Sequence, residues 1–251
     1  MNRTLRPSAV LLALSLVLAG CAGAAPGAPP AGAPGGEAAH PVPPGVHWFR
    51  TAAEQHGIYR QVYAWAGERV MTAATGMVEP WGVILDADET VLDNSLYQLR
   101  RARAGLGFSP ESWNEWVREE VAPALPGAVD FIERIRARGG RVAIVTNRDE
   151  AVCEPTRRNL AAVGVRADVV LCRAPGVSEK ETRFRAVHEG TAAPGLPPLR
   201  ILAWVGDNIR DFPGGGQGWR EDPGAAGADI GVRFFLLPNP MYGSWESNPV
   251  R

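Results

Sequence analysis

Four short apolar runs recur along the chain, and segments with the spacing of amphipathic helices separate them. The runs cover residues 82–85, 142–145, 168–172 and 201–205. They are rich in valine, isoleucine and leucine and do not alternate between apolar and polar positions, which is typical of parallel strands buried on both faces of a sheet. Together with the helical segments they predict an α/β fold with a Rossmann-like parallel sheet.

Four further segments carry apolar residues at helical spacing, namely 47–75, 111–120, 128–138 and 151–163. We expect the first to form one or two helices that pack on the body of the domain. The other three lie between successive apolar runs, where a parallel sheet needs helical crossovers.

Polar residues stand directly after three of the runs and a few positions after the remaining one. In open parallel sheets, ligands bind outside the carboxyl ends of the strands, so we expect these side chains to meet in one crevice. They are Asp86, Asp88, Thr146, Lys180, Asp207 and Asp211.

Four of these side chains are carboxylates, which repel one another and raise one another's pKa when they share a crevice. A hard divalent cation relieves the repulsion, and an oxygen shell completed by water suits Mg²⁺. A cation beside a hydroxyl and an ammonium group suits a phosphoryl group, whose transfer depends mainly on positioning and charge neutralisation. An aspartate held there is also able to act as a nucleophile and form an aspartyl-phosphate.

Lys180 is the single lysine among 26 basic residues, the others being arginine. This exception indicates a position that needs a compact ammonium group, where a planar guanidinium would not fit. A surface lysine of no functional importance is the alternative.

Four motifs follow one another in order: 86–90 (DADET), Thr146, Lys180 and 206–211 (GDNIRD). In this order they resemble the motifs of the haloacid dehalogenase superfamily. The longer segments 84–97 (ILDADETVLDNSLY) and 205–212 (VGDNIRDF) resemble the class C acid phosphatases, the lipoprotein 5′-nucleotidase branch of that superfamily. The resemblance runs from about residue 46 to the C-terminus and implies a haloacid dehalogenase core with a small, mainly helical cap.

By this resemblance, Asp86 is the nucleophile, while Asp88 protonates the leaving oxygen and later deprotonates the attacking water. Mg²⁺ is expected to bind to Asp86, to the backbone carbonyl of Asp88 and to Asp207. Asp211 is expected to hold metal-bound waters or to orient Lys180.

The resemblance also implies contacts with the phosphoryl group and the substrate. Thr146 is expected to donate to a phosphoryl oxygen, and Asn147 to contact the substrate. Arg183, one helical turn after Lys180, is a candidate for binding the substrate phosphate; pairing with an aspartate is the alternative. One position departs from the family pattern, because Ala87 stands where a larger aliphatic residue is more common. We expect a packing difference there and no loss of chemistry.

An insertion after the first motif commonly caps the crevice in this superfamily, so cap elements are expected within 46–76 and 93–125. In the resembled family, aromatic residues sandwich a nucleobase, which binds through its π-face. Trp113, in the inserted helical stretch, and Tyr242, in a proline-rich turn, are the candidates here. Each is alternatively a packing residue.

The N-terminus has the pattern of a bacterial lipoprotein. Two arginines, a short apolar core at 9–18 and a lipobox-like ending predict a signal peptide at 1–20 with Cys21 as the lipidated residue. Ordinary cleavage, with Cys21 an incidental thiol, is the alternative. The Ala-, Gly- and Pro-rich segment 21–45 predicts a tether, followed by a phosphatase domain at 46–251. We expect a lipid-anchored protein of the bacterial cell envelope, sorted to an outer membrane.

Composition and charge exclude several other classes of protein. With 26 basic and 27 acidic residues the net charge is −1, which argues against binding of a nucleic acid polymer. An apolar fraction of 45% excludes a wholly disordered chain. Three cysteines are too few for a disulfide scaffold. Pairing of Cys153 with Cys172 is left open, since the envelope is oxidising but each lies in an element expected to be buried.

These observations predict a Mg²⁺-dependent acid phosphatase for small phosphomonoesters, above all nucleoside 5′-monophosphates, with membrane contact only through the N-terminal lipid. A homodimer is compatible with the sequence. A phosphotransferase using the same aspartyl-phosphate is one alternative. A catalytically silent surface lipoprotein that binds ligands is the other, although both Asp86 and Asp88 are present.

Overall fold

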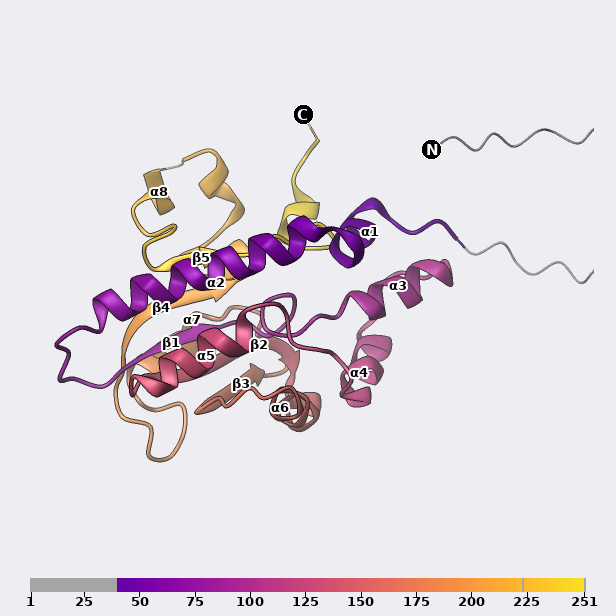
Figure 1. The fold of residues 1–251 in the computed structure, drawn as a ribbon. Helices are drawn as coiled ribbons and strands as arrows, with labels where there is room; N and C mark the ends of the chain where they lie inside the picture. Colours follow the sequence, from indigo (N-terminus) through magenta and orange to yellow (C-terminus); the bar gives the residue numbers. More distant parts are fainter. Residues whose placement is uncertain (1–39, 223, 251) are drawn as a thin grey trace, which may run out of the picture. The chain divides into compact units, whose positions relative to one another are not determined.

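The computed structural model, which describes residues 40–222 and 224–250, contains a five-stranded parallel sheet in the order β3–β2–β1–β4–β5 (Figure 1). Four of the strands coincide with the predicted apolar runs, so the α/β fold with a parallel sheet is confirmed. The strands are β1 (Trp81–Leu85), β2 (Arg141–Asp149), β3 (Val169–Arg173), β4 (Arg200–Gly206) and β5 (Phe234–Leu236).

The edge strand β5 is not predicted by the sequence pattern. Its three residues are too few to show a period, and they follow the glycine-rich stretch 213–227. The parallel pairing of Trp204 with Phe234 and of Gly206 with Leu236 makes it the fifth strand.

Helices precede the sheet and connect its strands, as the apolar spacing predicts. The α-helices are α1 (Pro44–Thr51), α2 (Ala53–Ala73), α3 (Ser95–Arg103), α4 (Pro110–Glu119), α5 (Ala128–Ala137), α6 (Cys153–Ala162), α7 (Glu181–His188) and α8 (Gly224–Gly227). Short 3₁₀ turns are η1 (Glu150–Val152), η2 (Ile209–Asp211), η3 (Gln217–Arg220) and η4 (Ser244–Ser247).

The side chains of β1 alternate between two apolar cores, one on each face of the sheet. Val83 and Leu85 belong to a cluster that includes residues of α2 and α5, whereas Ile84 packs with Phe184 and Val187 of α7. Burial on both faces explains why this strand is a continuous apolar run in the sequence.

Helix α2 lies along one face of the sheet, where it packs against α5, β4 and β5 (Figure 1). Tyr63 of α2 and Phe131 of α5 have ring centroids 5.4 Å apart. The buried face of α2 therefore supports the sheet, and none of its described residues lines the cleft at the strand ends. The role of the segment 46–76 as a cap stays a prediction, and the structure shows α2 packed against the sheet.

The strand order changes direction at β1, and this point determines where the predicted crevice lies. Strands β2 and β3 add to one side of β1, whereas β4 and β5 add to the other. Ligands bind at such switch points, outside the carboxyl ends of the strands. Because β1 ends just before Asp86 and β4 just before Asp207, the first and last motifs meet there.

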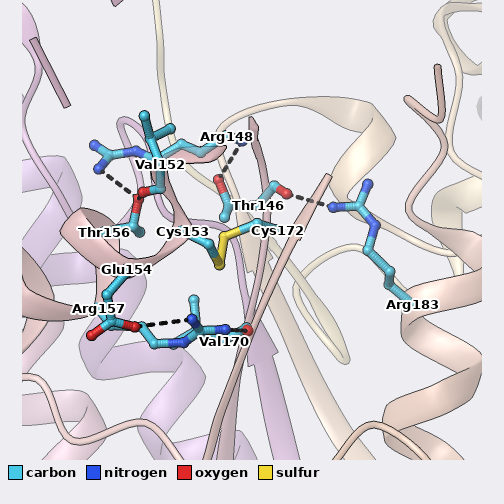
Figure 2. The surroundings of a disulfide bond; sticks show 10 residues. All are labelled: Thr146, Arg148, Val152, Cys153, Glu154, Thr156, Arg157, Val170, Cys172 and Arg183. Carbon is cyan, nitrogen blue, oxygen red and sulfur yellow. Dashed lines mark hydrogen bonds and ion pairs between the residues drawn. A yellow bond between two sulfur atoms is a disulfide. The ribbon is translucent and has the colours of Figure 1, made fainter. Parts of the chain in front are cut away.

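Cys153 and Cys172 form a disulfide that joins the start of α6 to the end of β3 (Figure 2). This pairing answers the question that the sequence leaves open. Both cysteines are buried, with their Cα atoms 5.8 Å apart. Burial in two neighbouring elements brings the thiols together and does not oppose the bond.

The N-terminal predictions fall largely outside the described residues. These are the signal peptide at 1–20, Cys21 and the tether up to residue 39. Helix α1 begins at Pro44, inside the segment predicted to be tether. In the described part of the chain, no helix has both the length and the apolar character needed to cross a bilayer.

Candidate active site

Three carboxylates from two neighbouring strand ends lie close together. Asp86 follows β1, while Asp207 and Asp211 follow β4. One carboxylate oxygen from each of the three lies within 4.8 Å of the other two. The turn η2 is held by a capping box, in which Asp211 accepts the Asn208 N–H at 2.8 Å and Asn208 accepts the Arg210 N–H at 3.1 Å. The sequence after β4 thus fixes Asp211 beside the strand end.

Lys180 lies inside this acidic cluster, at the residue that precedes α7. Its Nζ donates to Oδ1 of Asp86 and, at 2.7 Å, to Oδ1 of Asp211. The side chain is only 6% exposed. Burial disfavours its charge, but the two carboxylates outweigh that effect and raise the pKa of Lys180. The single lysine of the chain therefore remains an ammonium group between two aspartates.

Burial dominates the ionisation of the carboxylates. It raises the pKa of Asp86 to about 7, with Lys180 opposing the rise and the charges of Asp211 and Asp88 adding to it. Burial also raises the pKa of Asp207 well above its usual range, and the charges of Asp211 and Asp86 add to it. The carboxyl groups at these two strand ends therefore lose their protons less readily than exposed aspartates do.

This donor set fits a hard divalent cation. Asp86, Asp207 and Asp211 offer carboxylate oxygens, the ligand type that Mg²⁺ prefers, and Lys180 alone does not neutralise them. Two neighbours orient Asp207, because Thr90 donates to its Oδ1 at 3.2 Å and Asn239 donates to its Oδ2 at 2.8 Å. The position of Asp207 is therefore determined partly by a residue beyond β5.

Asp88 lies in the tight turn after β1, which Val91 and Leu92 close by donating to the carbonyl of Ala87. Its Oδ1 accepts from Nδ2 of Asn94 at 2.9 Å and from the Arg148 guanidinium at 2.8 Å. The side chain of Asp88 lines the cleft. Ala87 itself is buried in the core.

The end of β2 carries two of the sequence-derived candidates, and a third, Arg183 of α7, contacts them. Thr146 is fully buried and its Oγ1 accepts the Arg148 N–H at 3.2 Å, whereas Asn147 is exposed and lines the cleft. Arg183 does not line the cleft, because its guanidinium donates to the Thr146 carbonyl and, at 2.6 Å, to Oδ1 of Asn147. Arg183 therefore supports the end of β2, and its contact with a substrate stays a prediction.

A cleft of about 540 Å³ opens above the acidic cluster. Aromatic side chains from two distant segments form part of its wall. Phe108 and Trp113 belong to the insertion around α4, and Tyr242 to the segment after β5. The ring of Trp113 packs edge-on against Tyr97, with 5.0 Å between centroids. Both predicted aromatic candidates thus face the same cleft as Asp86.

Tyr242 is tied to the turn after β1 through a buried carboxyl group. Its hydroxyl donates to Oε2 of Glu89, while Oε1 of Glu89 accepts the Asn94 N–H at 2.7 Å. Glu89 is fully buried, and that burial raises its pKa well above the usual range. The C-terminal segment is therefore attached to the same turn that carries Asp88.

Sequence reasoning missed the supporting residues Glu89, Asn94 and Arg148. Glu89 and Asn94 lie inside the segment 84–97 that resembles the class C acid phosphatases, and Arg148 follows Thr146 at the end of a buried strand. The one signal for Arg148 in the sequence is a charged residue close to the end of an apolar run. Its partner lies 60 positions away, at Asp88, so the pattern alone does not reveal it.

Comparisons with known proteins agree with this geometry. The model of HAD superfamily subfamily IIIB (acid phosphatase) matches residues 36–245. The class C acid phosphatase from Bacillus anthracis is 31% identical, with a TM-score of 0.72 over 80% of this chain and 85% of that chain. A second crystal structure of that protein, with tungstate bound, gives a TM-score of 0.71 at the same identity and coverage.

A plant relative is more distant. Acid phosphatase 1 from Solanum lycopersicum is 27% identical over 162 residues, which are 63% of this chain and 57% of that protein. The chain therefore spans little more than half the length of that relative.

Proposed function

The chain belongs to the HAD superfamily, subfamily IIIB acid phosphatases, and we propose that it hydrolyses phosphomonoesters, above all nucleoside 5′-monophosphates, with the help of Mg²⁺. The observation that carries this proposal is the position of Lys180 between Asp86 and Asp211 at the ends of β1 and β4. An ammonium group and a cluster of carboxylates at a topological switch point suit a metal ion and a phosphoryl group together.

Asp86, Asp207 and the backbone carbonyl of Asp88 would hold the cation, with Asp211 beside them. When bound, Mg²⁺ supplies positive charge that offsets the carboxylates and the phosphate oxygens. Lys180 supplies a further positive charge beside Asp86. A phosphate dianion is therefore able to approach a site that would otherwise repel it.

In the first step, a carboxylate oxygen of Asp86 attacks phosphorus while the bond from phosphorus to the leaving oxygen breaks. The leaving oxygen takes a proton from Asp88, so an alcohol departs and an aspartyl-phosphate remains on Asp86. Asp88 lines the cleft next to Asp86, as this role requires.

In the second step, a water oxygen attacks phosphorus and gives a proton to Asp88. The bond between phosphorus and Asp86 breaks, which releases inorganic phosphate and restores both carboxyl groups. An alcohol in place of water would turn the same step into phosphoryl transfer, so the hydrolase and transferase proposals share every residue.

The aromatic wall supports a nucleoside as the leaving group. Trp113 and Tyr242 both line the cleft that also contains Asp86. A base that stacks on such side chains is held without base-specific hydrogen bonds, at about 1–3 kcal/mol per base. This predicts little discrimination among the nucleobases.

We also propose that the protein is attached to the bacterial envelope through lipid on Cys21, with sorting to an outer membrane. The lipobox-like ending of the segment 1–20 supports this. Metabolic labelling with a palmitate analogue should tag the wild-type chain and not Cys21→Ala. A labelled Cys21→Ala variant would contradict it.

Phosphate release from a nucleoside 5′-monophosphate tests the activity, measured from about pH 5 to about pH 8 with Mg²⁺ or a chelator. We expect turnover that needs the metal and disappears in Asp86→Asn. Including an alcohol and measuring its phosphorylation separates transfer from hydrolysis. If a folded, metal-loaded protein released no phosphate from any monoester, the proposal would fail.

A further inference from the structure

Strand β2 leaves the regular ladder at its carboxyl end. It pairs with β3 up to Val145 and Leu171, and pairing resumes only at Asp149 and Arg173. The residues between, 146–148, form an irregularity of the kind that re-aims side chains next to active sites. The consequence here is that Arg148 is directed to the turn after β1.

The Arg148 side chain is buried and makes specific contacts. It is 1% exposed. Its Nε and its Nη2 each lie 2.8 Å from Oδ1 of Asp88, and Nη2 also donates to Oδ1 of Asn94 at 3.0 Å. The guanidinium lies 5.8 Å from the centre of the Trp113 ring. Arg148 does not itself line the cleft, so it acts through Asp88 and does not touch substrate.

These contacts divide the two oxygens of Asp88 between two tasks. Arg148 and Asn94 both donate to Oδ1, whereas Oδ2 has no hydrogen-bond partner among the described residues. A planar, forked donor fixes the orientation of a carboxylate, which a point-like ammonium does not. One oxygen is therefore anchored, and the other remains available to carry the proton for the leaving group.

The far end of the irregular segment is braced twice. Arg173 donates to Asp149 directly after Arg148, and the Cys153–Cys172 disulfide closes the same corner (Figure 2). Cys153 begins α6, whose Thr156 accepts from Nη1 of Arg148 at 3.3 Å. The disulfide thus ties the helix turn that supports the guanidinium to β3, the strand that pairs with the β2 segment carrying Arg148.

We propose that Arg148 is a positioning residue that aims the Asp88 carboxyl group at the leaving oxygen, and that the Cys153–Cys172 disulfide braces it. The proposal rests on the proposed phosphatase activity. As the bond from phosphorus to the leaving oxygen breaks, the proton passes from Oδ2 of Asp88 to that oxygen. The competing explanation is that Arg148 only neutralises a partly buried charge, in which case its loss affects all substrates alike.

Substrates with different leaving groups separate these two explanations. A nitrophenolate departs without a proton, whereas the alkoxide of a nucleoside 5′-monophosphate needs one. We would measure kcat/KM of the full chain with p-nitrophenyl phosphate and with a nucleoside 5′-monophosphate. For Arg148→Lys we expect a loss of about 30-fold on the nucleotide and less than about threefold on the nitrophenyl ester. Arg157→Lys is the matched control, because Arg157 pairs with exposed Glu154 in the same corner.

The variant Cys153→Ala/Cys172→Ala tests the brace and decides the matter if Arg148→Lys does not fold. It keeps Arg148 and all its hydrogen-bond partners, so we expect the same preferential loss on the nucleotide, but about threefold to tenfold. Equal losses on both esters, in either folded variant, would overturn the proposal while leaving the phosphatase activity intact. A wild-type protein that turned over neither ester would instead contradict the proposed function.

Discussion

The two walls of the cleft differ in composition, in burial and in origin along the chain. The inner wall is charged and buried, and its members Asp86, Lys180 and Asp211 follow strands or begin a helix of the core. The outer wall is aromatic and partly exposed, and it comes from an insertion and a C-terminal segment. Under the proposed function, the inner wall performs the chemistry and the outer wall recognises the leaving group.

The two walls also differ in how strongly their members depend on one another. Buried charges are stable only as a set, because removing one leaves its partner uncompensated. Aromatic contacts are less directional, and each side chain contributes separately to the binding of a ring. Substitutions on the inner wall should therefore abolish turnover, and those on the outer wall should change affinity.

The largest effect is expected for the nucleophile. Asp86→Asn should lower kcat by about 10³-fold or more for every phosphomonoester, because no covalent intermediate forms without a carboxylate. Phosphate release measures the loss, and Asp130→Asn, at an exposed position at the start of α5, is the control. Substantial turnover by Asp86→Asn would remove the proposed distinction between the walls.

Loss of the Lys180 ammonium group between the carboxylates should have the next largest effect. Lys180→Met leaves Asp86 and Asp211 facing each other, so we expect unfolding free energy to fall by about 3 kcal/mol and turnover by about 10²-fold. Urea unfolding in the presence of a chelator measures the stability. Lys180→Arg should also be impaired, because a planar guanidinium does not fit between the two aspartates. A fully active Lys180→Arg variant would show that the inner wall tolerates a substitution we expect it to reject.

The outer wall should respond in affinity and not in chemistry. Trp113→Ala should raise KM for a nucleoside 5′-monophosphate by about tenfold, with little change in kcat, because a stacking surface is lost. Its kcat/KM for p-nitrophenyl phosphate should change much less. Trp65→Ala, at a half-exposed position of α2 that does not line the cleft, is the control. Equal losses on the two esters would mean that Trp113 stabilises the fold of the wall instead of recognising the base.

The smallest effect is a dependence of stability on pH, which follows from the inner wall. Burial raises the pKa of Asp86 from 3.8 to about 7, so between these values the folded chain binds more protons than the unfolded chain. The stability of the metal-free protein should therefore fall as pH rises through that window. We expect Tm in chelator to drop by a few degrees from about pH 5 to about pH 7.5, and Mg²⁺ to raise Tm more at the higher pH.

Asp86→Asn provides the check on this assignment, because it removes the group that titrates. Its Tm in chelator should change less between the two pH values than that of the wild-type chain. An unchanged slope would assign the effect to Asp207 or Glu89, whose pKa values burial also raises.

The same contrast between the walls explains what the sequence predicts. The strands appear as apolar runs, and Asp86, Thr146 and Asp207 follow them directly, so topology alone brings them together. The local sequence pattern therefore predicts the α/β fold and the residues that form the inner wall. The short strand β5 is not, because its identity depends on pairing with β4.

Supporting contacts depend on tertiary geometry and escape a local pattern. Arg183 follows Lys180 by one helical turn, and the spacing alone does not reveal that its guanidinium donates to the Thr146 carbonyl. Part of the segment expected to contribute cap elements forms α2, which packs against the sheet. Cys153 and Cys172 lie 19 positions apart, and their bond depends on α6 packing beside β3.

The central claim, that Asp86 carries the phosphoryl group, is tested most directly by trapping the intermediate. The protein would be mixed with a phosphomonoester and Mg²⁺, quenched in acid, and analysed by mass spectrometry of its peptides. We expect one added phosphoryl group on the peptide that contains Asp86, absent in Asp86→Asn and in the presence of a chelator. Phosphate release by the wild-type protein without any such adduct, or with the adduct on another residue, would contradict the claim.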